Sequence, residues 1–261
     1  MHNLVRGATV FTVVGLFAAS VSGLGGGNAW GSMMDGSMIF IDFEDDDEGD
    51  PILAGQMIDD EFAGWGVHIT AQNANRPNIK KVIAFDTANI TGGETDLVTP
   101  GYGPDNDTPL GMVLIVPANL TDGNGDGYVD EPEDHGHKPA GLISFEFDHV
   151  LQGGSIVTLD IQILETTTIE FFYRSGAELQ EALVESLEPV FTLVVPAMAD
   201  NGVQTLEWYG FLYDYMRINV GGSGAFDELT VYFADPAPEP TSIALLTLGL
   251  GMVLSRRRSA R

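Results

Sequence analysis

The sequence predicts an all-β fold, a sandwich of two β-sheets of the jelly-roll type. About ten short runs rich in β-branched and aromatic residues alternate with turns rich in Gly, Asn, Asp and Pro. Long stretches of Ala, Leu, Glu and Lys are scarce, which argues against a mainly helical protein. The 261 residues, 44% of them hydrophobic, suffice for one sizeable core or two small ones.

The expected strands follow from runs of alternating or β-branched residues in chain order. They are residues 38–43, 62–70, 82–85, 111–117, 142–147, 155–163, 167–173, 191–195, 203–209, 216–220 and 226–233. Residues 177–187 fit either a short helix that Pro189 closes or a β-hairpin. Residues 86–109 are dense in Gly, Asn, Asp, Thr and Pro, which predicts a long surface loop of a kind that often carries function.

The first 29 residues are typical of an export signal peptide. Arg6 supplies the charged start, residues 8–21 form an apolar stretch, and small residues 27–29 offer a cleavage site. Cleavage after Ser20 or Ser22 also fits the pattern. We therefore expect an exported protein whose body spans residues 30–233.

The charge of the chain limits its partners. There are 38 acidic and 11 basic residues, for a net charge of −27, and no Cys. A surface this acidic repels nucleic acid and attracts divalent cations, so nucleic acid is excluded as a partner. The lack of Cys excludes disulfides and thiolate metal sites, so calcium is the cross-link that we expect in an exported chain.

Residues 122–133, with the sequence DGNGDGYVDEPE, match the twelve-residue calcium-binding loop of the EF-hand. Gly127 lies at position 6, where the chain must turn sharply. The expected ligands are the oxygens at positions 1, 3, 5, 7, 9 and 12, with a backbone carbonyl at position 7 and a bidentate Glu at position 12. They belong to Asp122, Asn124, Asp126, Tyr128, Asp130 and Glu133. Because hard Ca²⁺ prefers six to eight oxygens, the pattern predicts a Ca²⁺ site.

The flanks of this loop are expected strands, at residues 111–117 and 142–147, and not the helices of an EF-hand. A calcium sensor needs a helix pair that opens. The loop therefore indicates a structural or adhesive calcium site.

The carboxyl end has three parts: a Pro-rich linker at residues 234–241, an apolar run at 242–254, and a tail with Arg256, Arg257 and Arg258. As a helix, the apolar run would cover roughly 20 Å of a membrane core of about 30 Å, so it is a short transmembrane helix that needs local thinning or snorkelling. The Arg cluster would lie on the cytoplasmic side.

Pro238, Glu239 and Pro240, the apolar run and the Arg cluster together resemble the PEP-CTERM sorting signal of exported proteins in Gram-negative bacteria. The resemblance implies an exosortase as processing partner, a transient anchor in the inner membrane, removal of the tail near the Pro-Glu-Pro, and delivery to the cell surface or the extracellular matrix. It covers only the tail and says little about the body.

More loosely, the body resembles the jelly-roll domains of carbohydrate-binding and adhesion proteins, through its opening residues 41–45 and closing residues 222–231. In such domains the first and last strands often share a calcium ion. The resemblance implies a second calcium site at Asp42 or Glu44 together with Asp227, although acidic residues are frequent enough here for the placement to arise by chance.

Other polar and aromatic residues are weaker indications. Asp134, His135 and His137 follow Glu133 and resemble a zinc or copper cluster, but with no distant third ligand we interpret them as loop residues beside the calcium site. Six aromatic residues are candidates for stacking on sugars or for core packing. They are Trp65, Tyr102, Trp208, Tyr209, Tyr213 and Tyr215.

No catalytic motif marks the chain, so the sequence predicts a non-enzymatic, structural or adhesive protein. Extracellular polysaccharide is one partner that this location would offer. The alternative is a carbohydrate-binding module or a glycoside-active enzyme on the same fold, because fold alone does not decide between them.

Overall fold

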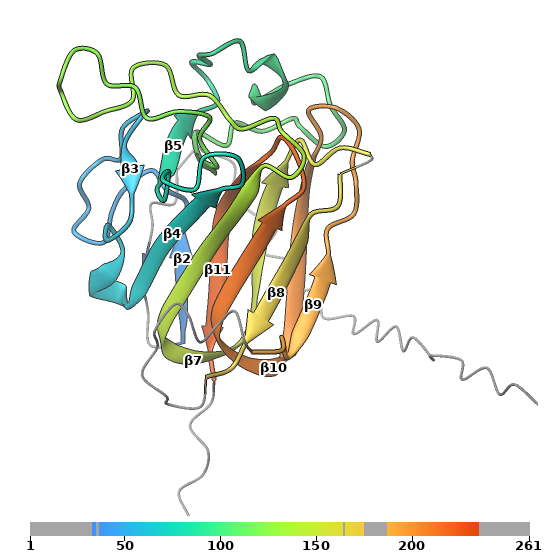
Figure 1. Ribbon diagram of the computed structural model, residues 1–261. Coiled ribbons are helices and arrows are strands. Elements are labelled where there is room, and N and C mark those ends of the chain that lie inside the picture. The colour runs from blue at the N-terminus through green and yellow to red at the C-terminus, as the bar shows by residue number, and fades with distance from the viewer. Residues whose placement is uncertain (1–32, 35–36, 164, 175–186, 235–261) are drawn as a thin grey trace, which may run out of the picture.

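The computed structural model describes residues 33–34, 37–163, 165–174 and 187–234. In these residues the regular structure is β-strand apart from two 3₁₀ turns, η1 (Ala63–Trp65) and η2 (Thr95–Leu97), so the all-β prediction is confirmed (Figure 1). The strands are β1 (Met33–Met34), β2 (Met38–Ile41), β3 (Met57–Ile58), β4 (Val67–Asn73), β5 (Val82–Asp86), β6 (Met112–Ile115), β7 (Gly141–Leu159), β8 (Thr168–Phe172), β9 (Phe191–Val194), β10 (Val203–Val220) and β11 (Ala225–Phe233).

All of these strands join one antiparallel sheet in the order β3–β5–β6–β11–β7–β10–β8–β9, with β2 also beside β11, β1 beside β2, and β4 beside β7. The long strands β7 and β10 belong to two layers. The first part of β7 pairs with β4 and its second part with β11, while the second part of β10 pairs with β8. The sandwich is therefore one continuous sheet folded over on itself, and not two separate sheets.

The fold-over is visible in the pairing of β7 with β10. Their register shifts between Tyr209 and Tyr213, opposite Gly153 and Leu151. These shifts bend the two strands together, because extra residues on one strand of a pair increase its local twist. The sequence predicted two strands for each of these long elements, at residues 142–147 and 155–163 for β7 and at residues 203–209 and 216–220 for β10.

The main core lies between the two layers. Alternate side chains of β7, β10 and β11 point into it, including Phe145, Ile156, Met216 and Val231, all fully or almost fully buried. The alternation separates neighbours in sequence: Trp208 is 6% exposed and Tyr209 is 70% exposed. Period-two alternation of this kind is what places every second side chain of a strand in the core.

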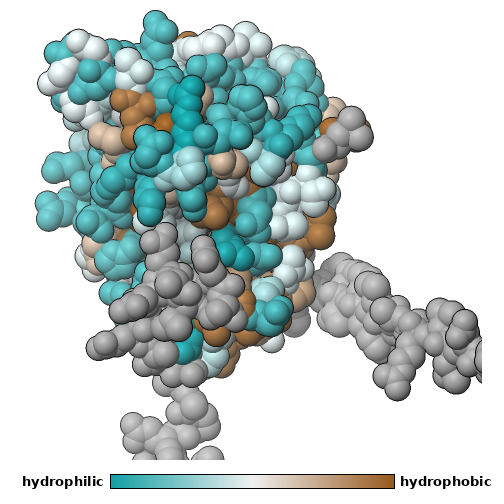
Figure 2. All heavy atoms as spheres, in the orientation of Figure 1, coloured by the Kyte–Doolittle hydropathy of each residue, from teal (hydrophilic) through white to brown (hydrophobic). Residues whose placement is uncertain are grey.

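A second, smaller core lies against β5 and β6 and includes Phe85, Leu97 and Val113. The two longest connections, residues 87–111 and 116–140, gather at this end of the sandwich (Figure 1). The surface there is largely hydrophilic (Figure 2). The candidate sites described below belong to these connections and their neighbours.

Some sequence predictions lie outside the described residues: the signal peptide at 1–29, most of the segment at 177–187, and nearly all of the linker and tail at 234–261. The two-residue strands β1 and β3 were missed, because so short a run gives no periodic signal. Among the described residues, no helix is long and apolar enough to cross a membrane.

Candidate functional site

The loop at residues 122–133 lies on the connection between β6 and β7. Its neck is closed, because the Ala118 amide donates to the Glu133 carbonyl at 2.9 Å and Pro117 pairs with Asp134 as an isolated antiparallel bridge. The closed neck holds the two ends of the loop together without help from a ligand.

Within the loop, carboxylates accept hydrogen bonds from the loop's own backbone. The Asp122 side chain accepts from the Gly125 amide at 2.7 Å and the Gly127 amide at 2.9 Å. Asp126 accepts from the Tyr128 amide at 2.9 Å, and Asp130 accepts from the Gly123 amide at 2.6 Å. Gly127 has φ +94°, the positive value that the predicted sharp turn requires. The side chains at positions 1, 5 and 9 therefore turn inward onto the loop.

The loop is anchored to the body through Val129, which is buried in the second core. The Val129 amide donates to the Gly55 carbonyl at 2.9 Å. Gly55 has φ +82°, and a Cβ there would lie 2.3 Å from the Val129 carbonyl oxygen, so only Gly permits this contact. A single apolar residue within an acidic loop thus connects the loop to β5 and β6.

The predicted calcium ligands are only partly brought together. Asp122, Asn124 and Asp126 are linked by hydrogen bonds at one end, but in the described structure no three carboxylates of the loop lie within 4.8 Å of one another. Glu133 lies at the other end, beside Gly92.

A different group of carboxylates does converge at metal-binding distance. The carboxylate oxygens of Asp96, Asp160 and Asp200 all lie within 4.8 Å of one another, and this cluster could hold a metal ion. Asp96 lies in η2, Asp160 follows β7, and Asp200 precedes β10. No pattern in the sequence indicates this group, because its members come from three distant segments and form no local motif.

Burial sets the electrostatics of the Asp cluster. Asp160 is fully buried, and burial, opposed by a hydrogen bond from the Asn201 amide at 2.7 Å and increased by the nearby Asp96, raises its pKa to about 7. Burial raises the pKa of Glu94 to about 8, with further repulsion from Asp134 and Asp96. A bound cation would relieve this repulsion.

Asn201 fixes the backbone around the Asp cluster. Its side-chain nitrogen donates to the Asp96 carbonyl at 2.7 Å, and its side-chain oxygen accepts from the Tyr102 amide at 2.9 Å. The Tyr102 hydroxyl donates to Asp200 at 2.6 Å, and this bond is the main cause that raises the pKa of Tyr102 to about 12. Tyr102 is 65% exposed, but its hydroxyl is already hydrogen-bonded to Asp200.

Asp134 links the Asp cluster to a pocket beside the loop. Ser223 donates its hydroxyl to Asp134 at 2.7 Å and also lies 3.2 Å from Asp160. The Gly224 amide donates to Asp134 at 2.9 Å, and burial raises the pKa of this carboxyl to about 6. The Asp134 carboxylate therefore faces Ser223 and Gly224.

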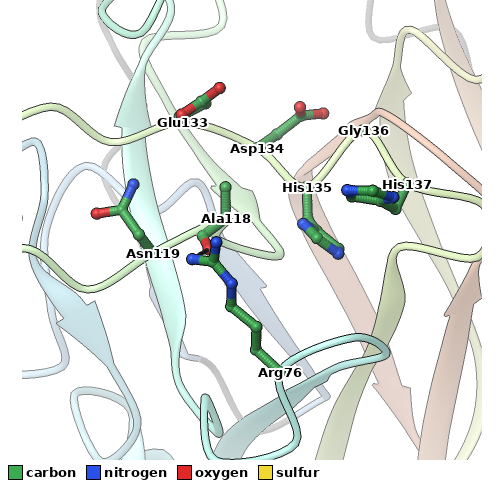
Figure 3. A pocket seen from close by; sticks show the side chains of 8 residues that line it. All are labelled: Arg76, Ala118, Asn119, Glu133, Asp134, His135, Gly136 and His137. Atoms are coloured by element: carbon green, nitrogen blue, oxygen red, sulfur yellow. Dashed lines mark hydrogen bonds between the residues drawn. The ribbon is translucent and has the colours of Figure 1, made fainter.

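The pocket has a volume of about 500 Å³ and a polar lining (Figure 3). Three segments line it: Arg76 from the loop after β4, Ala118 and Asn119 after β6, and residues 133–137 at the end of the calcium-type loop. Glu133 thus occupies position 12 of the loop and also lines the pocket.

His135 and His137 lie against each other on one side of the pocket, with ring centroids 4.7 Å apart. His135 is buried, its Nε2 lies 3.1 Å from the Asn75 side-chain nitrogen, and burial lowers its pKa. Within the described residues, neither His belongs to a group of three ligands at metal-binding distance. His135 is therefore a packed wall residue, and the solvated loop position that the sequence predicted fits only His137.

The second calcium site implied by the resemblance, at Asp42 or Glu44 together with Asp227, stays a prediction. Asp227 is buried, and burial raises its pKa, as do the nearby Asp42 and Glu44. The Glu44 carboxylate, however, accepts from the Met112 amide at 2.8 Å, and within the described part of the chain these residues form no group of three at metal-binding distance.

Most of the candidate aromatic residues serve the fold. The Trp208 indole donates to the Tyr213 hydroxyl at 2.9 Å, and that hydroxyl donates to the Gly153 carbonyl at 3.0 Å, all within the core. Trp65 packs against the main core, and Tyr215 lies against Phe172. Tyr209 and Tyr102 are the two that remain mostly exposed among these candidates.

No protein family and no curated protein matches the sequence. Among solved structures, the chain is similar to a fucose-binding module of Streptococcus pneumoniae, with a TM-score of 0.26, 9% identity, and coverage of 40% of this chain and 70% of the module. A second module of that organism, SpX-3, gives a TM-score of 0.26 and 12% identity over 40% of this chain and 72% of the module. At these TM-scores the similarity supports no conclusion about ligand or activity.

Proposed function

We propose that this chain is an exported calcium-binding protein that acts by binding, with a structural or adhesive role at the cell surface or in the extracellular matrix. The carrying observation is the loop at residues 122–133, which combines all six ligand positions with a closed neck and an apolar anchor at Val129. Two strands flank the loop, so calcium would rigidify one end of the sandwich without opening any helix pair.

Calorimetric titration with calcium tests this proposal. The parent protein should bind with a Kd of about 10⁻⁴–10⁻³ M or tighter, as extracellular calcium modules do. Glu133→Gln, which removes a charged ligand at position 12, should weaken binding at least about tenfold. Asp160→Asn is the matched control, because it removes one charge from the Asp cluster. If Asp160→Asn abolishes binding and Glu133→Gln leaves it unchanged, the Asp cluster is the calcium site.

A second candidate function is carbohydrate binding, which the polar pocket of Figure 3 favours. Its volume lies within the range of about 300–1,000 Å³ typical of small-molecule sites. Amide, imidazole and guanidinium groups line it, and these groups match sugar hydroxyls. A glycan-array screen with and without calcium tests this candidate. Binding to any glycan on the array would support it, and the absence of binding by properly folded protein would reject it.

We further propose that the tail is a PEP-CTERM-like sorting signal. Pro238 and Pro240 lack backbone donors, and Pro favours extended conformations, which would suit an exosortase cleft. The apolar run is too short for a firm anchor, which suits a temporary hold in the inner membrane. Mass spectrometry of the protein from its native cell should find a chain that ends near Glu239. An intact tail in the envelope fraction would favour a simple membrane tail instead.

A further inference from the structure

Arg76 is one of two basic side chains of the described body that form no ion pair, and of the two it alone lines the pocket. The other four, Lys81, Lys138, Arg174 and Arg217, each pair with a carboxylate, whereas Lys80 has no such pair among the described residues. Within the described residues, the Arg76 guanidinium has no ion-pair partner, although the chain carries a net charge of −27.

Arg76 is nonetheless held in place. Its backbone amide donates to the Asn73 side chain at 2.8 Å, and one guanidinium nitrogen donates to the Ala118 carbonyl. Figure 3 shows this guanidinium reaching up into the pocket beside Ala118. Since a guanidinium has five N–H donors, most of them remain for a ligand. A planar fork of this kind matches a carboxylate through two parallel hydrogen bonds.

The pocket is lined by two carboxylates, Glu133 and Asp134, which would repel a bound anion to different extents. Asp134 turns its side chain toward Ser223 and Gly224, which supply hydrogen bonds at 2.7 and 2.9 Å. Glu133 is position 12 of the loop, so a bound calcium ion would compensate its charge. With calcium in the loop, two charges remain at the pocket: the Arg76 guanidinium, which reaches into it, and the Asp134 carboxylate, which is hydrogen-bonded to Ser223 and Gly224.

The other pocket groups suit hydroxyls. The side-chain amide of Asn119 can donate and accept, and a neutral imidazole at His135 or His137 can do the same. We propose that the pocket binds a uronic acid, the acidic sugar of many polysaccharides, with its carboxylate on Arg76 and its hydroxyls on Asn119 and the imidazole pair. This inference rests on the carbohydrate-binding function proposed above and names its ligand class.

The experiment compares glucuronate with glucose, which differ only at C6, where a carboxylate replaces a hydroxymethyl group. Binding is followed by calorimetric or NMR titration of the purified protein in saturating calcium. The parent should prefer glucuronate by about tenfold or more, as expected for one charged bidentate contact. Arg76→Gln keeps the length and polarity of the side chain and should lose that preference. Lys80→Gln removes a neighbouring exposed charge that does not line the pocket, and it should retain the preference.

The outcomes separate this inference from the function on which it rests. Equal binding of glucose and glucuronate would leave carbohydrate binding in place and overturn the uronate assignment, as would an Arg76→Gln protein with the parent's preference. Failure of both sugars to bind a folded parent would overturn both. The link to the loop is overturned if glucuronate binds equally tightly in calcium and in EDTA, because Glu133 then exerts no control over the pocket.

Discussion

The loop at residues 122–133 and the cluster of Asp96, Asp160 and Asp200 are both acidic, but they are built differently. The loop is one continuous stretch in which the exposed carboxylates of Asp122, Asp126 and Asp130 accept hydrogen bonds from the loop's own backbone amides. The cluster is assembled from three segments around the fully buried Asp160. The ion-free loop therefore has little desolvation penalty, because its carboxylates remain in contact with water. The cluster needs either a proton or a cation to offset its buried charge.

The largest expected effect is that of calcium on the loop. An ion that binds only the folded state stabilises it by about 2.7 kcal/mol at a concentration one hundred times Kd. The melting temperature should therefore rise in excess calcium and fall in EDTA. The increase should disappear in Glu133→Gln. A melting temperature that is identical in calcium and EDTA would contradict the stabilising role of the ion.

The anchor of the loop gives the next effect. Gly55→Ala should lower the free energy of unfolding by about 1–3 kcal/mol, because Ala is strained at positive φ and its Cβ would collide with the Val129 carbonyl. Chemical denaturation measures the change. Gly49→Ala is a control, since Gly49 has a similar φ of +84° with open space around its Cβ position. Equal losses in both variants would show that the Val129 contact contributes nothing.

In the absence of metal, the Asp cluster should make the free energy of unfolding depend on pH. The folded-state pKa of Asp160 is raised to about 7, above its unfolded value, so the folded state binds more protons in this window. Stability should therefore decrease as the pH rises from about 4 to about 7, the window between the unfolded and folded pKa values of this group. Asp160→Asn should flatten the decrease when unfolding is followed in EDTA at several pH values. A slope unchanged in Asp160→Asn would mean that Asp160 is ionised at little cost.

The smallest effect is expected at the exposed rim of the cluster. Tyr102→Phe removes the hydroxyl that donates to Asp200 at 2.6 Å. Because Tyr102 is 65% exposed, water replaces much of this bond, and the loss of stability should be well below that of Gly55→Ala. Thermal unfolding measures it. A loss several times larger would indicate that Tyr102 holds the cluster together.

The same contrast explains what the sequence could predict. Alternation along the strands is visible in the sequence, and the structure has Trp208 inside and Tyr209 outside. Contiguous spacing predicts the six ligand positions of the loop. The continuity of β7 and β10 through their bends was not predictable, because pairing across layers is a tertiary effect. The approach of Asp96 to Asp160 depends on Asn201, which bonds to both segments, and no local pattern encodes that contact.

The pocket could be predicted from the sequence only in part. Asp134, His135 and His137 were visible as a polar group that follows the loop, and their interpretation as neighbours of the calcium site fits their place on the wall. Arg76 was not visible as a candidate, because it is far away in the sequence and reaches the pocket through the loop after β4. A cation without an ion pair in so acidic a chain can be recognised only once the other pairs are known.

Backbone NMR during a calcium titration compares the loop and the cluster most directly. The Gly125 and Gly127 amides donate to Asp122 in the loop, whereas the Asn201 amide donates to Asp160 in the cluster. The calcium-loop proposal predicts that the first equivalent of calcium shifts the Gly125 and Gly127 amide resonances and leaves Asn201 nearly unchanged. A first equivalent that shifts Asn201 and leaves the loop glycines unmoved would contradict it.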